Sequence, residues 1–158
     1  MTDLEPLFER MAPRLFRYAS AILGSAADAE EVVQDVLVAY AELKQAPGSP
    51  EGWLLKATRN AALKQIEGAR RRLGLLRKNV VLLIPREGAD PEQAVLAEKA
   101  SKALALLPVE QREAVALHLF EGLTFKEIAE AAEAPLDTIA SRYRYGIDKL
   151  REILDEPR

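Results

Sequence analysis

The stretch TFKEIAEAAEAPLDTIASRYRYGIDKL, from Thr124 to Leu150, predicts two short helices joined by a tight turn. The hydroxyl of Thr124 can cap the first helix, and Glu127, three residues later, can complete a capping box. Pro135 disfavours helical geometry in the residue before it but fits the first turn of a new helix. We therefore expect a helix-turn-helix unit near the end of the chain.

The second helix of this unit has an apolar and a polar side. With about 100° of rotation per residue, one apolar stripe is formed by Leu136, Ile139, Tyr143, Ile147, Leu150 and Leu154. The side chains that point elsewhere include Thr138, Ser141, Arg142, Arg144 and Tyr145. Hydroxyl and guanidinium groups bond phosphates and base edges, so this face favours DNA binding. A plain helical hairpin with a solvated outer face would show the same pattern, and the unit alone leaves both interpretations open.

Composition favours an all-α protein. The 158 residues are 49% hydrophobic and 30% charged, and only 6% are aromatic, which is typical of helices rather than sheets. The chain has no cysteine, so a disulfide framework and a thiolate metal site are both excluded. The first residues lack the features of a signal peptide, and no segment is apolar enough for a membrane span. We expect a cytoplasmic protein that does not contact a membrane.

Catalysis is not expected from this sequence. The sole histidine, His118, lies in an apolar helix, where a structural imidazole is favoured over a general base. The sequence has no Gly-rich phosphate loop, no metal-ligand spacing of histidines and carboxylates, and no nucleophile near a base. We therefore expect no enzyme, no catalytic residue, no metal and no cofactor.

The formal net charge of −3 hides a strong segregation of charge. Residues 1–51 carry nine acidic and four basic side chains, a net charge of −5. Residues 52–87 carry nine basic and two acidic side chains, a net charge of +7. A phosphate backbone responds to local charge, because electrostatic fields decay over a Debye length of about 10 Å. The acidic total therefore does not exclude a nucleic-acid partner.

Two helical blocks flank a segment of different character. The first block, residues 1–73, is predicted to hold three helices, of which the third starts at Trp53. The second block, residues 91–158, contains the helix-turn-helix. Residues 74–90 between them have no clean period and are rich in turn-forming residues at their end, which is typical of a flexible linker. Within it, the apolar run Val80–Ile84 is expected to pack on a domain or a partner.

Two further helix faces are candidate sites. In DAEEVVQDVLVAY, residues 28–40, acidic side chains and Gln34 lie opposite an apolar face. This favours docking on a basic partner helix, although simple solvation would explain it too. In WLLKATRNAAL, residues 53–63, a basic helix follows a loop rich in Pro and Gly, an arrangement that suits single-stranded nucleic acid. Trp53 is interpreted either as part of the core or as an aromatic surface for a base.

These segments in this order resemble an extracytoplasmic-function type sigma factor of the sigma-70 family. Residues 28–40 are similar to the core-binding helix of sigma region 2, and residues 53–63 to the helix that melts the promoter and reads the −10 element. Residues 107–152 are similar to sigma region 4. The resemblance implies two small helical domains, region 2 in residues 1–73 and region 4 in residues 91–158, joined by a flexible linker. It also implies an alternative sigma factor, which binds core RNA polymerase and directs promoter-specific initiation.

The resemblance assigns roles to particular residues. Docking on the clamp helices of the polymerase β′ subunit would use Asp28, Glu31, Gln34 and Asp35. Contacts with −10 DNA would be made by Trp53, Lys56, Arg59, Asn60, Arg70, Arg71 and Arg72. Region 4 would sit on the β flap and contact the −35 element of promoter DNA through Thr124, Lys126, Thr138, Ser141, Arg142, Arg144 and Tyr145. An anti-sigma factor is a further expected partner.

The chain departs from the family pattern at several positions. Ala140 stands where Lys or Arg is common, Glu133 where the turn often has Gly, Lys64 where Asp is more frequent, and Tyr145 where Arg is usual. Direct readout of guanine by arginine is therefore partly lost, and we expect Arg144 to take over that role. We expect an unusual −35 preference, or a weaker dependence on the −35 element, rather than lost function. Two other functions stay open, a stand-alone helix-turn-helix regulator and a sigma-like adaptor that no longer reads DNA.

Overall fold

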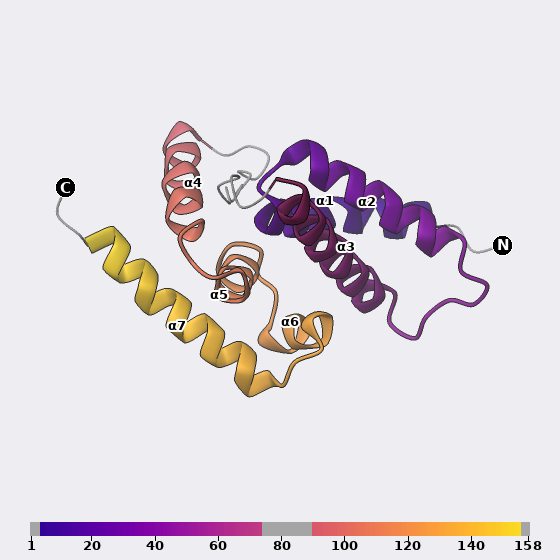
Figure 1. Cartoon of the computed structure of the whole chain (residues 1–158). Helices are drawn as coiled ribbons and strands as arrows, with labels where there is room; N and C mark the ends of the chain where they lie inside the picture. Colours follow the sequence, from indigo (N-terminus) through magenta and orange to yellow (C-terminus); the bar gives the residue numbers. More distant parts are fainter. Residues whose placement is uncertain (1–3, 74–89, 156–158) are drawn as a thin grey trace.

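The computed structural model describes residues 4–73 and 90–155, and all the regular secondary structure of these residues is helical (Figure 1). The first block consists of α1 (Glu5–Leu23), α2 (Ala26–Ala41) and α3 (Pro50–Leu73). The second consists of α4 (Pro91–Leu104), α5 (Val109–Val115), the π-helical turn η1 (Ala116–Phe120), α6 (Phe125–Ala132) and α7 (Leu136–Asp155). The all-α prediction is confirmed, whereas the run Val80–Ile84 lies outside the described residues.

Local capping explains where the helices begin and end. Gly24, with a φ of 69°, closes α1 in the left-handed conformation that glycine adopts without strain. The hydroxyl of Ser25 accepts a hydrogen bond of 3.2 Å from the backbone N–H of Asp28 and so caps α2. The third helix begins at Pro50, three residues before the predicted start at Trp53. Proline suits a first helical turn, because the N–H that it lacks would have no partner within the helix there.

The first block packs around apolar side chains from all three of its helices. Buried members are Met11, Leu15, Tyr18, Val32, Val36, Leu54 and Ala62. The ring of Trp53 stands edge-on to that of Tyr40 with 5.4 Å between centroids, and Trp53 packs against this core. Trp53 is partly buried against this core, and its alternative role as an aromatic surface for a base stays a prediction.

The second block is held by a close approach of α7 to α5. A Cβ on Gly146 would lie 2.6 Å from Cγ2 of Val115, so glycine permits this contact. The predicted buried stripe on α7 is correct at Ile139 and Leu150 but wrong at Leu136 and Leu154, which are 53% and 62% exposed. The reason is length, since α7 has 20 residues whereas α5 and α6 have seven and eight. The ends of α7 therefore extend beyond the helices that cover its middle.

The two blocks pack against each other (Figure 1). Helix α3 contacts α6, and α1 contacts α5. One cluster of buried side chains contains Leu15 and Leu54 from the first block together with Leu117 and Ile128 from the second. Periodicity predicts which face of a helix is buried but not which partner covers it, and this contact was not predicted from the sequence.

Candidate nucleic-acid interface

The predicted capping box and tight turn are both present in the helix-turn-helix. The hydroxyl of Thr124 accepts a hydrogen bond from the N–H of Glu127, and the carboxylate of Glu127 accepts one from the N–H of Thr124, both at 3.0 Å. Helix α6 ends at Glu133, whose φ of 52° is left-handed. A side chain in this conformation costs roughly 1 kcal/mol relative to glycine. The turn therefore has a left-handed residue at a position that glycine would occupy without strain.

His118 fixes the helix-turn-helix onto the π-helical turn. Its Nδ1 donates a hydrogen bond of 2.8 Å to the carbonyl of Leu123. Its ring lies 4.2 Å from the ring of Phe125 at the start of α6 and 4.9 Å from that of Tyr143 on α7, measured between centroids. The predicted structural imidazole is confirmed, and the contacts explain why both helices are held in a defined orientation.

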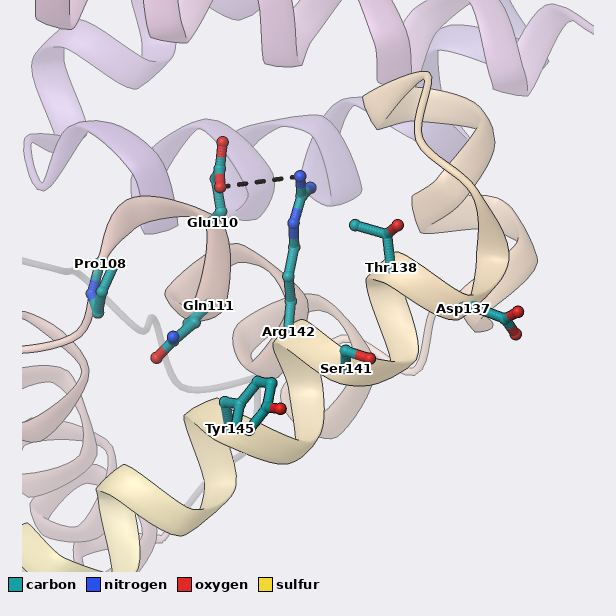
Figure 2. Close-up of a pocket in the computed structure, with 8 residues that line it drawn as sticks. All are labelled: Pro108, Glu110, Gln111, Asp137, Thr138, Ser141, Arg142 and Tyr145. Atoms are coloured by element: carbon teal, nitrogen blue, oxygen red, sulfur yellow. Dashed lines mark ion pairs between the residues drawn. The ribbon is translucent and has the colours of Figure 1, made fainter.

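An open hollow of about 370 Å³ lies between the start of α5 and the outward face of α7 (Figure 2). From the α5 side it is lined by Pro108, Glu110 and Gln111, and from α7 by Asp137, Thr138, Ser141, Arg142 and Tyr145. Four of the residues predicted to contact −35 DNA therefore gather around one solvent-facing hollow. Their hydroxyl, guanidinium and phenol groups come from successive turns of one helix, as major-groove reading requires.

One cationic side chain, Arg142, lines this hollow, and a second, Arg144, lies beside Tyr145. The guanidinium of Arg142 is 3.7 Å from the carboxylate of Glu110, and Figure 2 shows the side chain reaching from α7 toward α5. The guanidinium carbon of Arg144, an exposed residue, lies 5.7 Å from the ring centre of Tyr145, within cation–π range. Lys126 is exposed on α6 and Thr124 is engaged in the capping box, and neither lines the hollow.

The predicted docking residues lie on the solvent side of α2. Glu31, Gln34 and Asp35 are exposed, opposite the buried valines of that helix. Asp28 is half-buried in the first turn, where a negative charge also suits the helix dipole. The acidic face is thus available to a partner, with Asp28 at its edge.

The predicted −10 residues of α3 are divided between solvent and the second block. Asn60 is exposed. Lys56 forms an ion pair with Glu133 at the end of α6, and Nε of Arg59 lies 2.6 Å from the carboxylate of Glu113 on α5. The residues Arg70, Arg71 and Arg72 belong to the last turns of α3, and their side chains lie outside the described part of the structure.

Three polar side chains, Tyr18, Arg59 and Glu113, meet in the contact between the blocks. Glu113 was not predicted from the sequence as a functional residue. Its Oε2 accepts a hydrogen bond of 2.5 Å from the hydroxyl of Tyr18 and one of 2.6 Å from Arg59. Burial raises the pKa of Tyr18 well above its usual range, and the charge of Glu113 raises it further. Burial lowers the pKa of Arg59, but the hydrogen bond and charge of Glu113 outweigh this, and the net shift is upward. The phenol is therefore held neutral and the guanidinium charged.

Among the described residues, no group of three or more His, Cys, Asp or Glu side chains could hold a metal ion. None of the helices described is long and apolar enough to cross a membrane.

Both halves of the chain match models of one protein family. Residues 7–72 match sigma-70 region 2, and residues 103–152 match sigma-70, region 4. The chain belongs to the sigma-70 family. The predicted resemblance is confirmed, and each match falls inside one of the two blocks.

Curated relatives place this sigma-70 chain in the extracytoplasmic-function (ECF) branch. The ECF RNA polymerase sigma factor SigE of Mycolicibacterium smegmatis is 32% identical over 98% of this chain, which spans 62% of the length of SigE. SigL of Mycobacterium tuberculosis is 29% identical over 97% of this chain and 89% of its own length. The sigma factor RpoE of Bartonella quintana, crystallised with the anti-sigma factor NepR, shares the fold with a TM-score of 0.78 at 24% identity, over the full length of both chains.

Proposed function

We propose that this chain is an alternative sigma factor that binds core RNA polymerase through α2 and grips promoter DNA at two points. Helix α7 reads the −35 element, and α3 holds the −10 element. The observation that carries this proposal is the gathering of Thr138, Ser141 and Arg142 around the open hollow on α7 (Figure 2). Tyr145 lies on the same face of α7. This face therefore offers hydrogen-bonding groups to both base edges and phosphates.

The −35 preference is set by what replaces the usual basic residues of the family. Ala140 offers no hydrogen bond, and Tyr145 offers a phenol and an aromatic face. The guanidinium carbon of Arg144 lies 5.7 Å from the centre of the Tyr145 ring. We propose that Arg144 supplies the arginine contact with guanine and that Tyr145 contacts the neighbouring base or sugar.

Partners follow from the exposed faces. The acidic side of α2, with Glu31, Gln34 and Asp35, suits the basic clamp helices of the β′ subunit, and region 4 suits the β flap. An anti-sigma protein is a further proposed partner, because the related RpoE was crystallised with one. The protein would act where RNA polymerase does, in the cytoplasm.

The decisive test is transcription from a library of bacterial genomic fragments by core polymerase plus the purified chain. We expect initiation from a small promoter set that core enzyme alone does not use. Charge reversal by Asp35→Lys should abolish initiation and co-purification with core enzyme, whereas Glu42→Gln at the exposed end of α2 should change neither. Tight binding to duplex DNA without polymerase, combined with unchanged behaviour of Asp35→Lys, would instead indicate a stand-alone regulator.

Readout by α7 is tested at the −35 position of any promoter found. Arg144→Ala should reduce discrimination of the guanine-containing element by about 10-fold to 100-fold, as expected for loss of one bidentate contact. Arg151→Ala, an exposed arginine two turns further along α7, is the matched control and should leave discrimination unchanged. Equal effects of the two substitutions would show that α7 contributes charge but no sequence readout.

A further inference from the structure

Glu110 lies beside the residues that α7 is proposed to present to DNA. It stands in the first turn of α5, and its side chain is 63% exposed. Its carboxylate is 3.7 Å from Nη2 of Arg142, whose side chain is 23% exposed and reaches from α7 toward α5 (Figure 2). The pair therefore joins the first turn of α5 to the second turn of α7 within the lining of the hollow.

Acidic side chains outnumber basic ones around this hollow. Among the described residues that line it, Glu110 and Asp137 are acidic and Arg142 is basic, which gives a formal charge of 1 − 2 = −1. A surface that only follows phosphates needs the opposite balance, because affinity for the DNA backbone comes from cations that neutralise it. The hollow is therefore poorly suited to a phosphate, although it lies on the face that is proposed to meet DNA.

The ion pair holds the guanidinium of Arg142 without using its hydrogen bonds. A separation of 3.7 Å gives an attraction between charges but is too long for a hydrogen bond. A guanidinium has five N–H donors, and none of those of Arg142 is spent on Glu110. The donors can therefore meet an acceptor in the hollow while the carboxylate stays beside them.

The neighbouring carboxylate changes which acceptors attract this guanidinium. A phosphate carries a negative charge, which Arg142 attracts and Glu110 repels. A base edge offers neutral acceptors, such as N7 and O6 of guanine, which need a well-placed N–H donor and no net charge. Glu110 therefore weakens the attraction of Arg142 for a phosphate more than it weakens a hydrogen bond from Arg142 to a base.

We propose that Glu110 is a specificity-determining residue, which positions Arg142 and offsets its charge so that the guanidinium contacts a base edge instead of a phosphate. The reading of the −35 element by α7 rests on the proposed function. The coupling between Glu110 and Arg142 is a property of the purified chain and can be measured without polymerase. Because Glu110 acts through Arg142, its effect must vanish when Arg142 is absent.

The salt dependence of binding to random-sequence duplex DNA reports how many phosphates the chain neutralises. Glu110→Gln keeps the shape of the side chain and leaves Arg142 free to bind a phosphate. The slope of log affinity against log salt concentration should become steeper by about 0.9, the value for one added phosphate contact. In an Arg142→Ala background, Glu110→Gln should leave the slope at the value of Arg142→Ala alone.

The matched control is Glu152→Gln, since Glu152 is exposed on α7 and does not line the hollow. Its slope should equal that of the parent chain. The charge of Glu110 also acts on Arg59 of α3, and the Arg142→Ala background separates the two effects, because only the one through Arg142 disappears there. An unchanged slope for Glu110→Gln, a change no larger than that of Glu152→Gln, or the same change with and without Arg142 overturns the proposal.

Discrimination at the −35 element tests whether this coupling affects specificity. With core polymerase and a promoter from the genomic library, Glu110→Gln should lower the preference for the −35 element over its single-base variants by about threefold or more. This is part of the roughly 10-fold to 100-fold that one bidentate contact is worth. A steeper salt slope with unchanged discrimination overturns the specificity role. A chain that supports no initiation from any fragment would refute the proposed function, whereas the salt slopes would still decide the coupling between Glu110 and Arg142.

Discussion

The two helices that this sigma factor is proposed to present to promoter DNA are in opposite situations. The polar face of α7 opens onto a solvent-facing hollow (Figure 2). Arg144 is exposed on the same helix. The cations of α3 are paired with carboxylates of the other block. One proposed DNA-binding surface is therefore open to solvent, whereas the other is paired with the second block.

The arginine–glutamate ion pairs near these two helices also differ in exposure. Arg142 and Glu110 lie within the second block, and the Glu110 side chain is 63% exposed. Arg59 and Glu113 join the blocks, and their side chains are 13% and 2% exposed. Exposed pairs contribute little because water screens them, whereas a broken buried pair leaves an uncompensated charge. The Arg59–Glu113 pair is therefore expected to contribute more to the free energy of unfolding than the Arg142–Glu110 pair.

The largest expected effect comes from Arg59→Ala. Removal of this guanidinium leaves Glu113 buried with Tyr18 as its remaining donor, and the free energy of unfolding should fall by about 3 kcal/mol. Arg142→Ala, the matched change in the exposed pair, should cost less than about 1 kcal/mol. Urea denaturation measures both. Equal losses of unfolding free energy would mean that the Arg59–Glu113 pair contributes no more to stability than an exposed ion pair.

Gly146→Ala tests how α7 is held in place. The added methyl group would meet Val115 at 2.6 Å and the backbone carbonyl of Gln111 at 3.3 Å. Overpacking of this kind costs about 1 to 3 kcal/mol, partly offset by the higher helix propensity of alanine of about 1 kcal/mol. Thermal unfolding should show a net loss of about 1 kcal/mol. Gly48→Ala, where nothing lies within 4 Å, should be neutral, and an equally neutral Gly146→Ala would argue against the close helix contact.

Ionisation of Tyr18 should make the free energy of unfolding depend on pH in the alkaline range. Because the pKa of Tyr18 is raised in the folded chain, its contribution to stability is complete below the ordinary tyrosine pKa of about 10 and is lost as the pH rises through the raised value. Tyr18→Phe removes this dependence and one hydrogen bond to a charged group. Unfolding free energies measured from pH 8 to 11 should fall more steeply for the parent chain than for the variant. Parallel curves would exclude a buried phenol at this position.

The smallest effect is expected at Glu133. The hydrogen bond and charge of Lys56 lower the pKa of this exposed carboxyl, so its contribution to the contact between the two blocks is present at neutral pH. It is lost as the pH falls through the lowered value, below the ordinary glutamate pKa of about 4.3. The distance between spin labels at Glu30→Cys and Lys149→Cys should therefore differ slightly between the parent chain and Glu133→Gln at neutral pH. The two distances should converge in acid. A difference that persists in acid would point to a cause other than this ion pair.

Much of the fold follows from local sequence. Apolar periodicity predicted the helices, and the hydroxyls of Ser25 and Thr124 correctly predicted where two of them begin. Errors arose where neighbours decide burial, as at Leu136 and Leu154, which lie beyond the shorter helices that cover α7. Periodicity assigns a face to each residue but carries no information on how far a partner helix extends.

The contact between the blocks could not be predicted in the same way. Arg59 and Glu113 are 54 positions apart, and Tyr18 and Glu113 are 95 apart. The available signal was a carboxylate at a helical position one turn before the buried Leu117. A charged residue on an apolar face usually has a partner, but the sequence does not say which. Four of the seven residues predicted to contact −35 DNA line the α7 hollow, because they lie on one helix, and their role in DNA binding stays a prediction.

The most direct test of the account is the distance between labels at Glu30→Cys and Lys149→Cys in two states. In the isolated chain we predict one short, narrow distribution. In a transcriptionally active complex with core polymerase and promoter DNA, we predict a longer distance, since α3 must release Glu113 and Glu133 to hold the −10 element. The same short distance in both states would contradict the account.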